Sequence, residues 1–241
     1  MTAPPSPELS VVIPIYNEEA ILHSAVVDLV DRLGELDRRW EILLSENGST
    51  DGTVAIAEEL REKYASLELL RTGEPNYGKA LRAGILAARA PIVFCDEIDL
   101  CDVRFYKSAL PLLEGGGADL VVGSKAMAGA RDRRPAVRRL ATHVLNGLLR
   151  TTVGYRGTDT HGLKAFRRDA LVGTAERCKV ERDLFASEFV IRAYREGKRV
   201  VEIPVEVLEK RTPSINLVRR VPNVLGNLAR LTWLFRVEDR S

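Results

Sequence analysis

Four acidic residues follow a short apolar run in the stretch from Pro91 to Asp102, which reads PIVFCDEIDLCD. The β-branched and aromatic residues of Ile92 to Cys95 predict a buried strand that leads into an acidic loop. If strand geometry continues, Glu97 and Asp99 project to the same side, about 7 Å apart at their Cα atoms. Crowded carboxylates repel one another unless a cation lies between them, and Mg²⁺ or Mn²⁺ is usually held by carboxylates together with substrate phosphates. We therefore predict a divalent-cation site at Glu97 and Asp99; the alternative is a set of solvated acids, with Asp102 capping the next helix.

A basic run follows further along the chain. It contains one acid, Asp132, and six basic residues: Lys125, Arg131, Arg133, Arg134, Arg138 and Arg139. Such runs are usually solvated, but arginine is well suited to gripping phosphates. Because this run follows a predicted strand, we expect Lys125 and Arg131 to act at the site, and Arg133 and Arg134 to lie on the solvated surface.

Alternating strand and helix patterns should position these groups. Strands are predicted at Leu9–Ile15, Trp40–Ser45, Leu67–Leu70, Ile92–Cys95, Asp119–Gly123 and Arg199–Val207, and helices from Ile21 and at Asp51–Tyr64, Asn76–Arg89, Val103–Leu113 and Asp183–Gly197. Strands that alternate with helices of this length predict an α/β fold with a mostly parallel sheet, whose ligands bind at the carboxyl ends of the strands. Three polar loops, at residues 16–19, 46–52 and 97–102, should therefore meet at one edge. Within the predicted helix Asp183–Gly197, we expect the lone acid Glu188 to be a paired structural residue; the alternative is a catalytic base.

Two of the loops leave alternatives open. The second loop, ENGSTDGT, is either a well-capped turn or a helix start whose free N–H groups bind an anion. The segment GEPNYGKA resembles a P-loop, but Ala80 stands where a P-loop needs Ser or Thr, and the segment follows the third strand instead of the first. We therefore disfavour a P-loop NTPase. Lys79 lies in the first turn of a predicted helix, where the dipole disfavours it, and so indicates an anion nearby.

Composition sets the broad class. The chain has 241 residues, 45% hydrophobic and 29% charged, as in soluble globular proteins. A net charge of +2 and 6% aromatic residues argue against a nucleic-acid partner. The three cysteines show no CxxC spacing, which favours a reducing cytoplasm over a disulfide framework. We expect a disordered lead-in at residues 1–8, no signal peptide and no membrane span.

The C-terminal segment from Leu217 to Arg236 is basic and amphipathic. Its apolar residues at helical spacing are Leu217, Val221, Val224, Leu228, Leu231 and Phe235. Two readings remain open: a helix on an anionic membrane surface, with the protein peripheral on its cytoplasmic face, or a helix packed on the domain or on a second subunit of a homodimer. Pro222 and Gly226 weaken the prediction of one long helix.

Several motifs in order resemble family 2 glycosyltransferases of the Rossmann-like GT-A fold. They are VVIPIYNEE, ENGSTDGT, NYGKALRAG, EID, GSKAMAG, GTDTHGLKAFRR, the FASEFVIRAYREGKRVVEIPVEV stretch and KRTPS. Within the family, the chain is most similar to the polyprenyl-phosphate sugar transferases typified by dolichyl-phosphate mannose synthase. The resemblance implies a single glycosyltransferase domain at 9–212, followed by the helical segment 213–241.

The resemblance also implies roles for individual residues. Glu97 and Asp99 would hold the metal and act in catalysis with Lys125 and Arg211. The nucleotide sugar, GDP-mannose or a UDP-sugar, would contact Pro14, Tyr16, Glu18, Glu46, Asn47, Lys79 and Ile98. The acceptor phosphate would contact Arg131, Arg138 and Ser214. The reaction implied is transfer of a sugar, with inversion, to a polyprenyl phosphate; the alternatives are a soluble or glycan hydroxyl acceptor, or a non-catalytic nucleotide-sugar-binding protein.

Four positions depart from the family pattern. The second loop begins with Glu46 and Asn47 in place of two aspartates, and the first acid of the metal motif is Glu97 in place of aspartate. Lys125 replaces an arginine, so a point charge stands in place of a planar fork.

Overall fold

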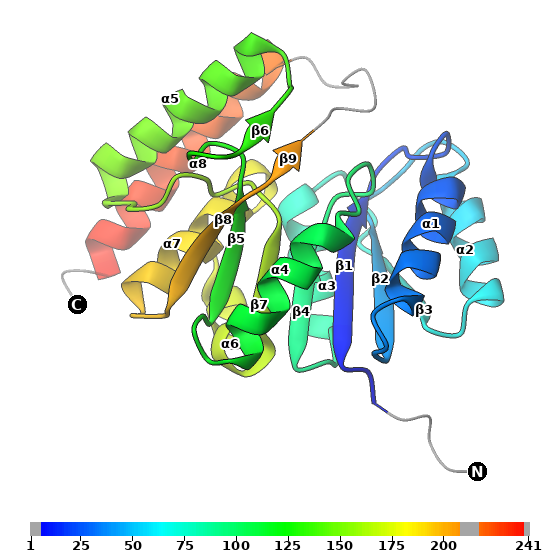
Figure 1. Cartoon of the computed structure of the whole chain (residues 1–241). Helices are drawn as coiled ribbons and strands as arrows, with labels where there is room; N and C mark the ends of the chain where they lie inside the picture. The colour runs from blue at the N-terminus through cyan, green and yellow to red at the C-terminus, as the bar shows by residue number, and fades with distance from the viewer. Residues whose placement is uncertain (1–5, 208–216, 239–241) are drawn as a thin grey trace.

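A seven-stranded sheet forms the centre of the computed structural model, which describes residues 6–207 and 217–238 (Figure 1). Its strand order is β3-β2-β1-β4-β7-β5-β8. The strands are β1 (Leu9–Ile15), β2 (Trp40–Glu46), β3 (Leu67–Arg71), β4 (Ile92–Cys95), β5 (Leu120–Ser124), β7 (Lys164–Arg167) and β8 (Val200–Pro204). A separate two-stranded sheet pairs β6 (Arg131–Asp132) with β9 (Glu206–Val207). The two predicted site residues Arg211 and Ser214 lie outside the described residues.

The sheet is mostly parallel, as predicted. The exception is β7, which runs antiparallel to both of its neighbours, β4 and β5. Its register places Lys164 opposite Cys95, the last residue of β4. The start of β7 therefore lies at the carboxyl end of β4, beside the acidic loop.

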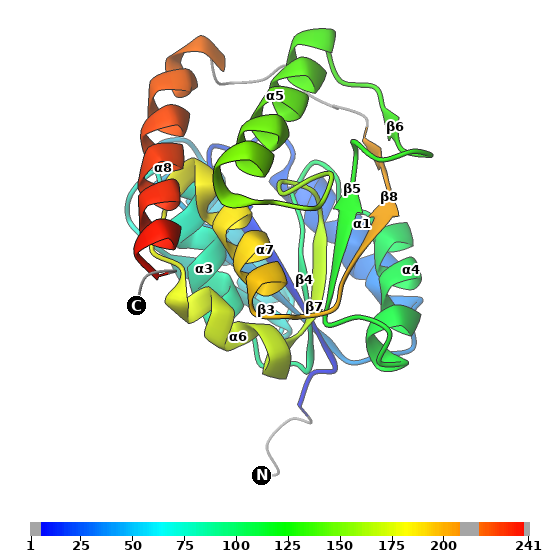
Figure 2. The same cartoon turned by 90° about the vertical axis from the view of Figure 1, so that its left-hand side faces the viewer.

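Helices cover both faces of the sheet. They are α1 (Leu22–Gly34), α2 (Thr53–Lys63), α3 (Tyr77–Ala87), α4 (Val103–Glu114), α5 (Ala136–Val153), α6 (Arg168–Arg177), α7 (Phe185–Arg195) and α8 (Leu217–Glu238), with a 3₁₀ turn, η1, at Arg182–Leu184. One hydrophobic core lies between the sheet and α1, α2 and α4, and the other is formed with α3, α5, α6, α7 and α8 (Figure 2). The molecule is a three-layer α/β domain of the kind predicted.

Three predicted segments differ from the structure. The strand predicted from Arg199 to Val207 is divided, because the chain leaves the main sheet after Pro204 and continues as β9. Residues 1–5 of the predicted lead-in lie outside the described residues, whereas Glu8 forms ion pairs with Arg38 and Arg39. The C-terminal segment forms one helix that continues through Pro222.

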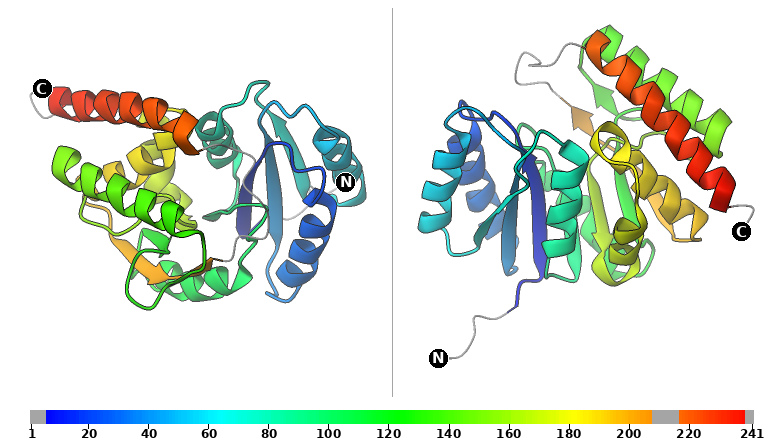
Figure 3. Two further views of the ribbon diagram at one scale, coloured as in Figure 1. Left: turned by 90° about the horizontal axis from the view of Figure 1, so that it is seen from above. Right: turned by 180° about the vertical axis from the view of Figure 1, so that it is seen from behind.

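Helix α8 packs on the domain. Leu228, Leu231 and Phe235, which belong to its predicted apolar stripe, are buried in the second core. Its last turn is fixed by Glu238, which pairs with the Arg192 guanidinium, and Arg192 also pairs with the fully buried Glu188. Packing of this stripe on the domain is therefore confirmed, as is the structural role of Glu188. Helix α8 lies beside α5 (Figure 3). None of the helices at 6–207 and 217–238 has both the length and the apolar character required to cross a membrane.

Candidate functional site

The acidic loop is organised around Asp96, the first residue after β4. Asp96 is 2% exposed and accepts hydrogen bonds from the backbone N–H groups of Glu97 and Asp102 and from the Tyr106 hydroxyl. Burial raises the pKa of Asp96 to about 7, although these hydrogen bonds act in the opposite direction. Asp102 caps α4 by accepting from the Arg104 N–H, as predicted. The carboxyl group of Asp96 therefore holds both ends of the loop in place.

A turn, and not a continued strand, carries Glu97 and Asp99. The strand ends at Cys95, and the N–H groups of Leu100 and Cys101 bond to the Glu97 carbonyl. The predicted strand geometry of the two acids is therefore wrong, but the acids remain electrostatically coupled. The Glu97 side chain reaches solvent yet is crowded by protein. This desolvation and the Asp99 charge raise the pKa of Glu97, while Lys125, Lys164 and Arg134 oppose the rise.

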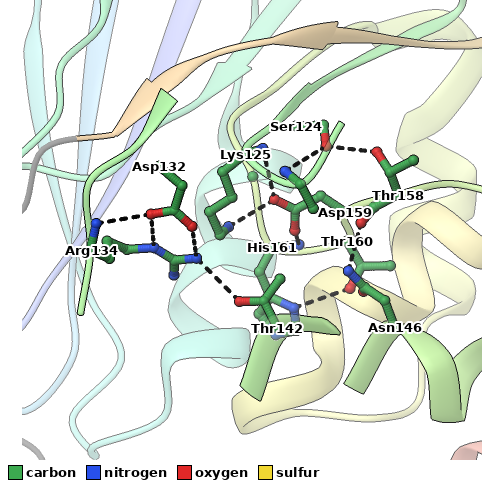
Figure 4. A network of polar contacts seen from close by, with 12 residues as sticks. Ser124, Lys125, Asp132, Arg134, Thr142, Asn146, Thr158, Asp159, Thr160 and His161 are labelled. Carbon is green, nitrogen blue, oxygen red and sulfur yellow. Dashed lines mark hydrogen bonds and ion pairs between the residues drawn. The ribbon is translucent and has the colours of Figure 1, made fainter. Parts of the chain in front are cut away.

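Lys125 is held by a buried ion pair with Asp159 (Figure 4). Their side chains are 9% and 1% exposed, and Lys125 Nζ lies 2.9 Å from Asp159 Oδ2. Asp159 also accepts from the N–H groups of Lys125 and His161. Burial alone would raise the pKa of Asp159, but Lys125 and the His161 N–H hold it below its usual value. The Lys125 ammonium is thus fixed near the acidic loop by its partner.

Lys164 places a second buried cation near the acidic loop. It is 3% exposed, and its Nζ donates to the Gly162 carbonyl at 2.7 Å. Burial lowers the pKa of Lys164, and the electrostatic effects of Cys95, Asp159 and Glu97 partly offset this lowering. The motif GTDTHGLKAFRR contains both Asp159 and Lys164, and neither residue belongs to the basic run at 125–139. The available signal was a lysine at the start of an apolar strand pattern, since lysine is rarely buried without a partner.

The basic run before and within α5 is arranged differently from the prediction. Arg134, which was expected to be solvated, is 13% exposed and makes a two-pronged contact with Asp132, and it also donates to Thr142 Oγ1 (Figure 4). Its effect on the pKa of Glu97 places it on the acidic-loop side. Arg131, which was expected at the site, is exposed, and Arg138 is half-buried. Sequence alone could not show which arginines of this run turn inward.

The first and second loops bind each other. In the loop before α2, three N–H groups bond to side chains: Ser49 N–H to Glu46, Thr50 N–H to Asn17, and Gly52 N–H to Glu19. At the first turn of α2, Asp51 Oδ1 accepts from the Thr53 N–H, as the prediction of a capped turn expects, and anion binding at the helix start stays a prediction. Glu46 is 1% exposed, and Glu18, 6% exposed, donates its N–H to Thr53 Oγ1. Pro14 is buried in β1 at the same edge of the sheet, and Tyr16, which follows it, is half-buried.

The loop between β3 and α3 is tied to the second polar loop, residues 46–52, through two asparagines. Asn47 Oδ1 accepts from the Asn76 N–H, and the Asn76 side chain caps α3 and donates to Glu181. Lys79 points to Glu74, and its Nζ lies 2.7 Å from the Glu74 carboxylate in an exposed ion pair. The anion indicated by Lys79 is therefore a carboxylate of the same loop. Tyr77 lies near the acids instead, since Glu97 and Asp99 add to the effect of burial in raising its pKa.

Residues 10–172 match the family described as Glycosyl transferase family 2. The chain belongs to this family. It is 28% identical over 238 residues to the glycosyltransferase AglD of Haloferax volcanii, covering 97% of this chain but 38% of AglD. It is 28% identical over 219 residues to dolichyl-phosphate beta-glucosyltransferase ALG5D of Trichomonas vaginalis, covering 84% of this chain and 66% of that protein. An uncharacterized glycosyltransferase of Mycobacterium tuberculosis is 31% identical over 201 residues, covering 82% of this chain and 84% of that protein.

Solved structures of similar fold include glucosyl-3-phosphoglycerate synthase of Mycobacterium tuberculosis. In its complex with Mn²⁺, UDP and glucosyl-3-phosphoglycerate, the TM-score is 0.68 at 20% identity, over 94% of this chain and 80% of that chain. In its complex with Mg²⁺ and UDP, the TM-score is 0.66 at 22% identity, over 94% and 79%. This likeness confirms the predicted GT-A fold. Membership of Glycosyl transferase family 2 makes the chain a glycosyltransferase domain.

Proposed function

We propose that this family 2 glycosyltransferase moves a sugar from a nucleotide-diphosphate donor to a polyprenyl phosphate, in a reaction that requires Mg²⁺ or Mn²⁺. The observation that carries the proposal is the pairing of opposite charges at one loop edge. Glu97, two residues from Asp99, is coupled electrostatically to three basic side chains, Lys125, Lys164 and Arg134, and the first and last of these are held by the acids Asp159 and Asp132. A reaction that joins two phosphate-bearing substrates needs such an arrangement, because both substrates are anionic.

The acids fit a divalent cation. Mg²⁺ and Mn²⁺ accept one or two carboxylates together with substrate phosphate oxygens. In the described parts of the chain, no three His, Cys, Asp or Glu side chains gather into a potential metal site. Glu97 and Asp99 would therefore hold the cation with oxygens of the donor diphosphate. When bound, the cation supplies charge stabilisation for the departing diphosphate.

The basic residues of the site support a phosphate as the acceptor group. A phosphate monoester has a second pKa of about 6, so its oxygen is already anionic at neutral pH and needs little help from a general base. Lys125, fixed by Asp159, and Arg134, fixed by Asp132, can hold this phosphate without reorganising. The phosphate oxygen would then displace the donor diphosphate in line, which inverts the anomeric carbon. The similarity to a protein named as a dolichyl-phosphate beta-glucosyltransferase supports this acceptor class.

Two measurements test the proposal. In calorimetric titrations of UDP and GDP with and without Mn²⁺, we expect metal-dependent binding that is lost in Glu97→Gln/Asp99→Asn. In product assays, we expect sugar transfer to polyprenyl phosphate, with kcat reduced on the order of 100-fold or more in that variant. Glu74→Gln, which alters an exposed acid of the neighbouring loop, is the matched control and should keep both properties.

Each outcome distinguishes the proposal from its alternatives. Transfer only to a hydroxyl acceptor would replace the polyprenyl phosphate with a soluble or glycan acceptor. Binding of nucleotide that is indifferent to Mn²⁺ and to both acids would contradict the metal site.

A further inference from the structure

The exposed large hydrophobic side chains are confined to two helices. Among the side chains described, at residues 6–182, 184–207 and 222–238, every such side chain lies on α5 or α8. They are Val137, Leu140 and Val144 on α5, which are 53–66% exposed, and Leu225, Trp233 and Val237 on α8, which are 45–63% exposed. The two helices pack side by side on one flank of the molecule (Figures 1 and 3). We call this outer surface of α5 and α8 the two-helix face.

The two-helix face is separate from the stripe that packs on the domain. On α5, the spacing of Val137, Leu140 and Val144 puts them on one side of the helix, while Thr142 and Asn146 on the other side contact the site. On α8, Leu228 and Phe235 are buried, whereas Leu225 and Trp233 line an open groove beside Thr152 of α5. The face is therefore a second apolar surface, distinct from the stripe recognised in the sequence.

The same helices carry a large net positive charge. Their sequences contain seven arginines and one glutamate, Glu238, which is paired with Arg192. They therefore carry a net charge of +6, while the whole chain carries only +2, so the remaining residues carry −4. Arg139 on α5 and Arg230 on α8 are exposed. This charge asymmetry favours an anionic partner.

We propose that the two-helix face docks on an anionic lipid bilayer. Exposed aliphatic side chains, an exposed Trp and surrounding arginines match the interface between acyl chains and anionic headgroups. A second copy of the chain is disfavoured, because a two-fold interface would place two patches of the same charge against each other.

The test measures bilayer binding without any sugar donor or acceptor, so its outcome is independent of the proposed reaction. The full-length protein is sedimented with vesicles of phosphatidylcholine alone or mixed with phosphatidylglycerol. We expect binding to the mixed vesicles only, and weaker binding at high salt. Leu140→Asp/Trp233→Asp should abolish it, and Arg139→Gln/Arg230→Gln should lower the partition coefficient about 25-fold, at about fivefold for each arginine.

Matched controls separate docking from general charge and folding effects. Arg61→Gln/Lys63→Gln removes two exposed cations from α2, far from the two-helix face in Figure 1, and should bind within about twofold of the wild type. Circular dichroism and thermal unfolding should show every variant folded. Equal binding of wild type to both vesicle types, or unchanged binding by the α5 and α8 variants, would overturn the proposal. A concentration-dependent dimer that Leu140→Asp dissociates would overturn it in favour of a second copy.

Discussion

Breaking the Lys125–Asp159 pair should destabilise the protein far more than breaking an exposed pair of equal length. Both side chains are at most 9% exposed and lie 2.9 Å apart. Removing one partner of a buried pair leaves an uncompensated charge and costs about 3–5 kcal/mol. Asp159→Asn should therefore lower the free energy of unfolding by about 4 kcal/mol and Tm by about 10 °C for a chain of this size. Urea unfolding followed by circular dichroism measures the first quantity, and a thermal scan measures the second.

The control is an ion pair of the same length on the surface of the protein. Arg167 and Asp169 also lie 2.9 Å apart, but their side chains are 35% and 71% exposed. Asp169→Asn should cost no more than about 1 kcal/mol. Lys125→Met/Asp159→Asn should be less destabilised than the sum of its single variants, with a coupling energy of about 2 kcal/mol. If Asp159→Asn cost no more than Asp169→Asn, or if the coupling were zero, the reasoning that Asp159 fixes a buried charge would be refuted.

Two further predictions concern Asp96 and Lys79. Burial raises the pKa of Asp96 from 3.8 to about 7, so its contribution to stability is greatest at acidic pH and is lost as the pH rises from about 4 to 7. Relative to Asp96→Asn, the wild type should lose about 3 kcal/mol of unfolding free energy between about pH 5 and pH 8; parallel urea-unfolding profiles of the two proteins would contradict the shift. Lys79 contacts Glu74 in an exposed pair, so Lys79→Ala should change the free energy of unfolding by less than about 1 kcal/mol. The nucleotide affinity of this variant, measured by calorimetry, should be unaltered. A large loss of affinity would instead place Lys79 at the nucleotide.

The α/β fold and the acidic motif could be predicted because they depend on local patterns. The alternation of apolar strands with amphipathic helices specified a mostly parallel sheet, and the position of Glu97 and Asp99 after a strand specified the edge at which they lie. No strand was predicted at β7, and its antiparallel direction has no local signature, because its residues, Lys-Ala-Phe-Arg, give the same basic, apolar, apolar, basic pattern in either direction.

The basic side of the site was predicted less well for a different physical reason. Arg131 and Arg134 lie three positions apart in one charged run, and their local sequence does not distinguish them. Arg134 turns inward because Asp132 and Thr142 provide acceptors for its guanidinium. The partnership of Lys125 with Asp159 spans 34 residues, so it depends on the folded sheet and has no local signature.

The reversed direction of β7 has a consequence for how this enzyme can diversify. The parallel strands deliver side chains to the reaction edge after they end, whereas β7 delivers Asp159 and Lys164 before or as it begins. Insertions in the connection that precedes β7 should therefore alter the chemistry. Insertions at Arg167 and Arg168, where β7 passes into α6, fall at the opposite rim of the sheet and should be tolerated. A loop grafted before β7 should therefore change the reaction, whereas a loop grafted after β7 should leave it unchanged.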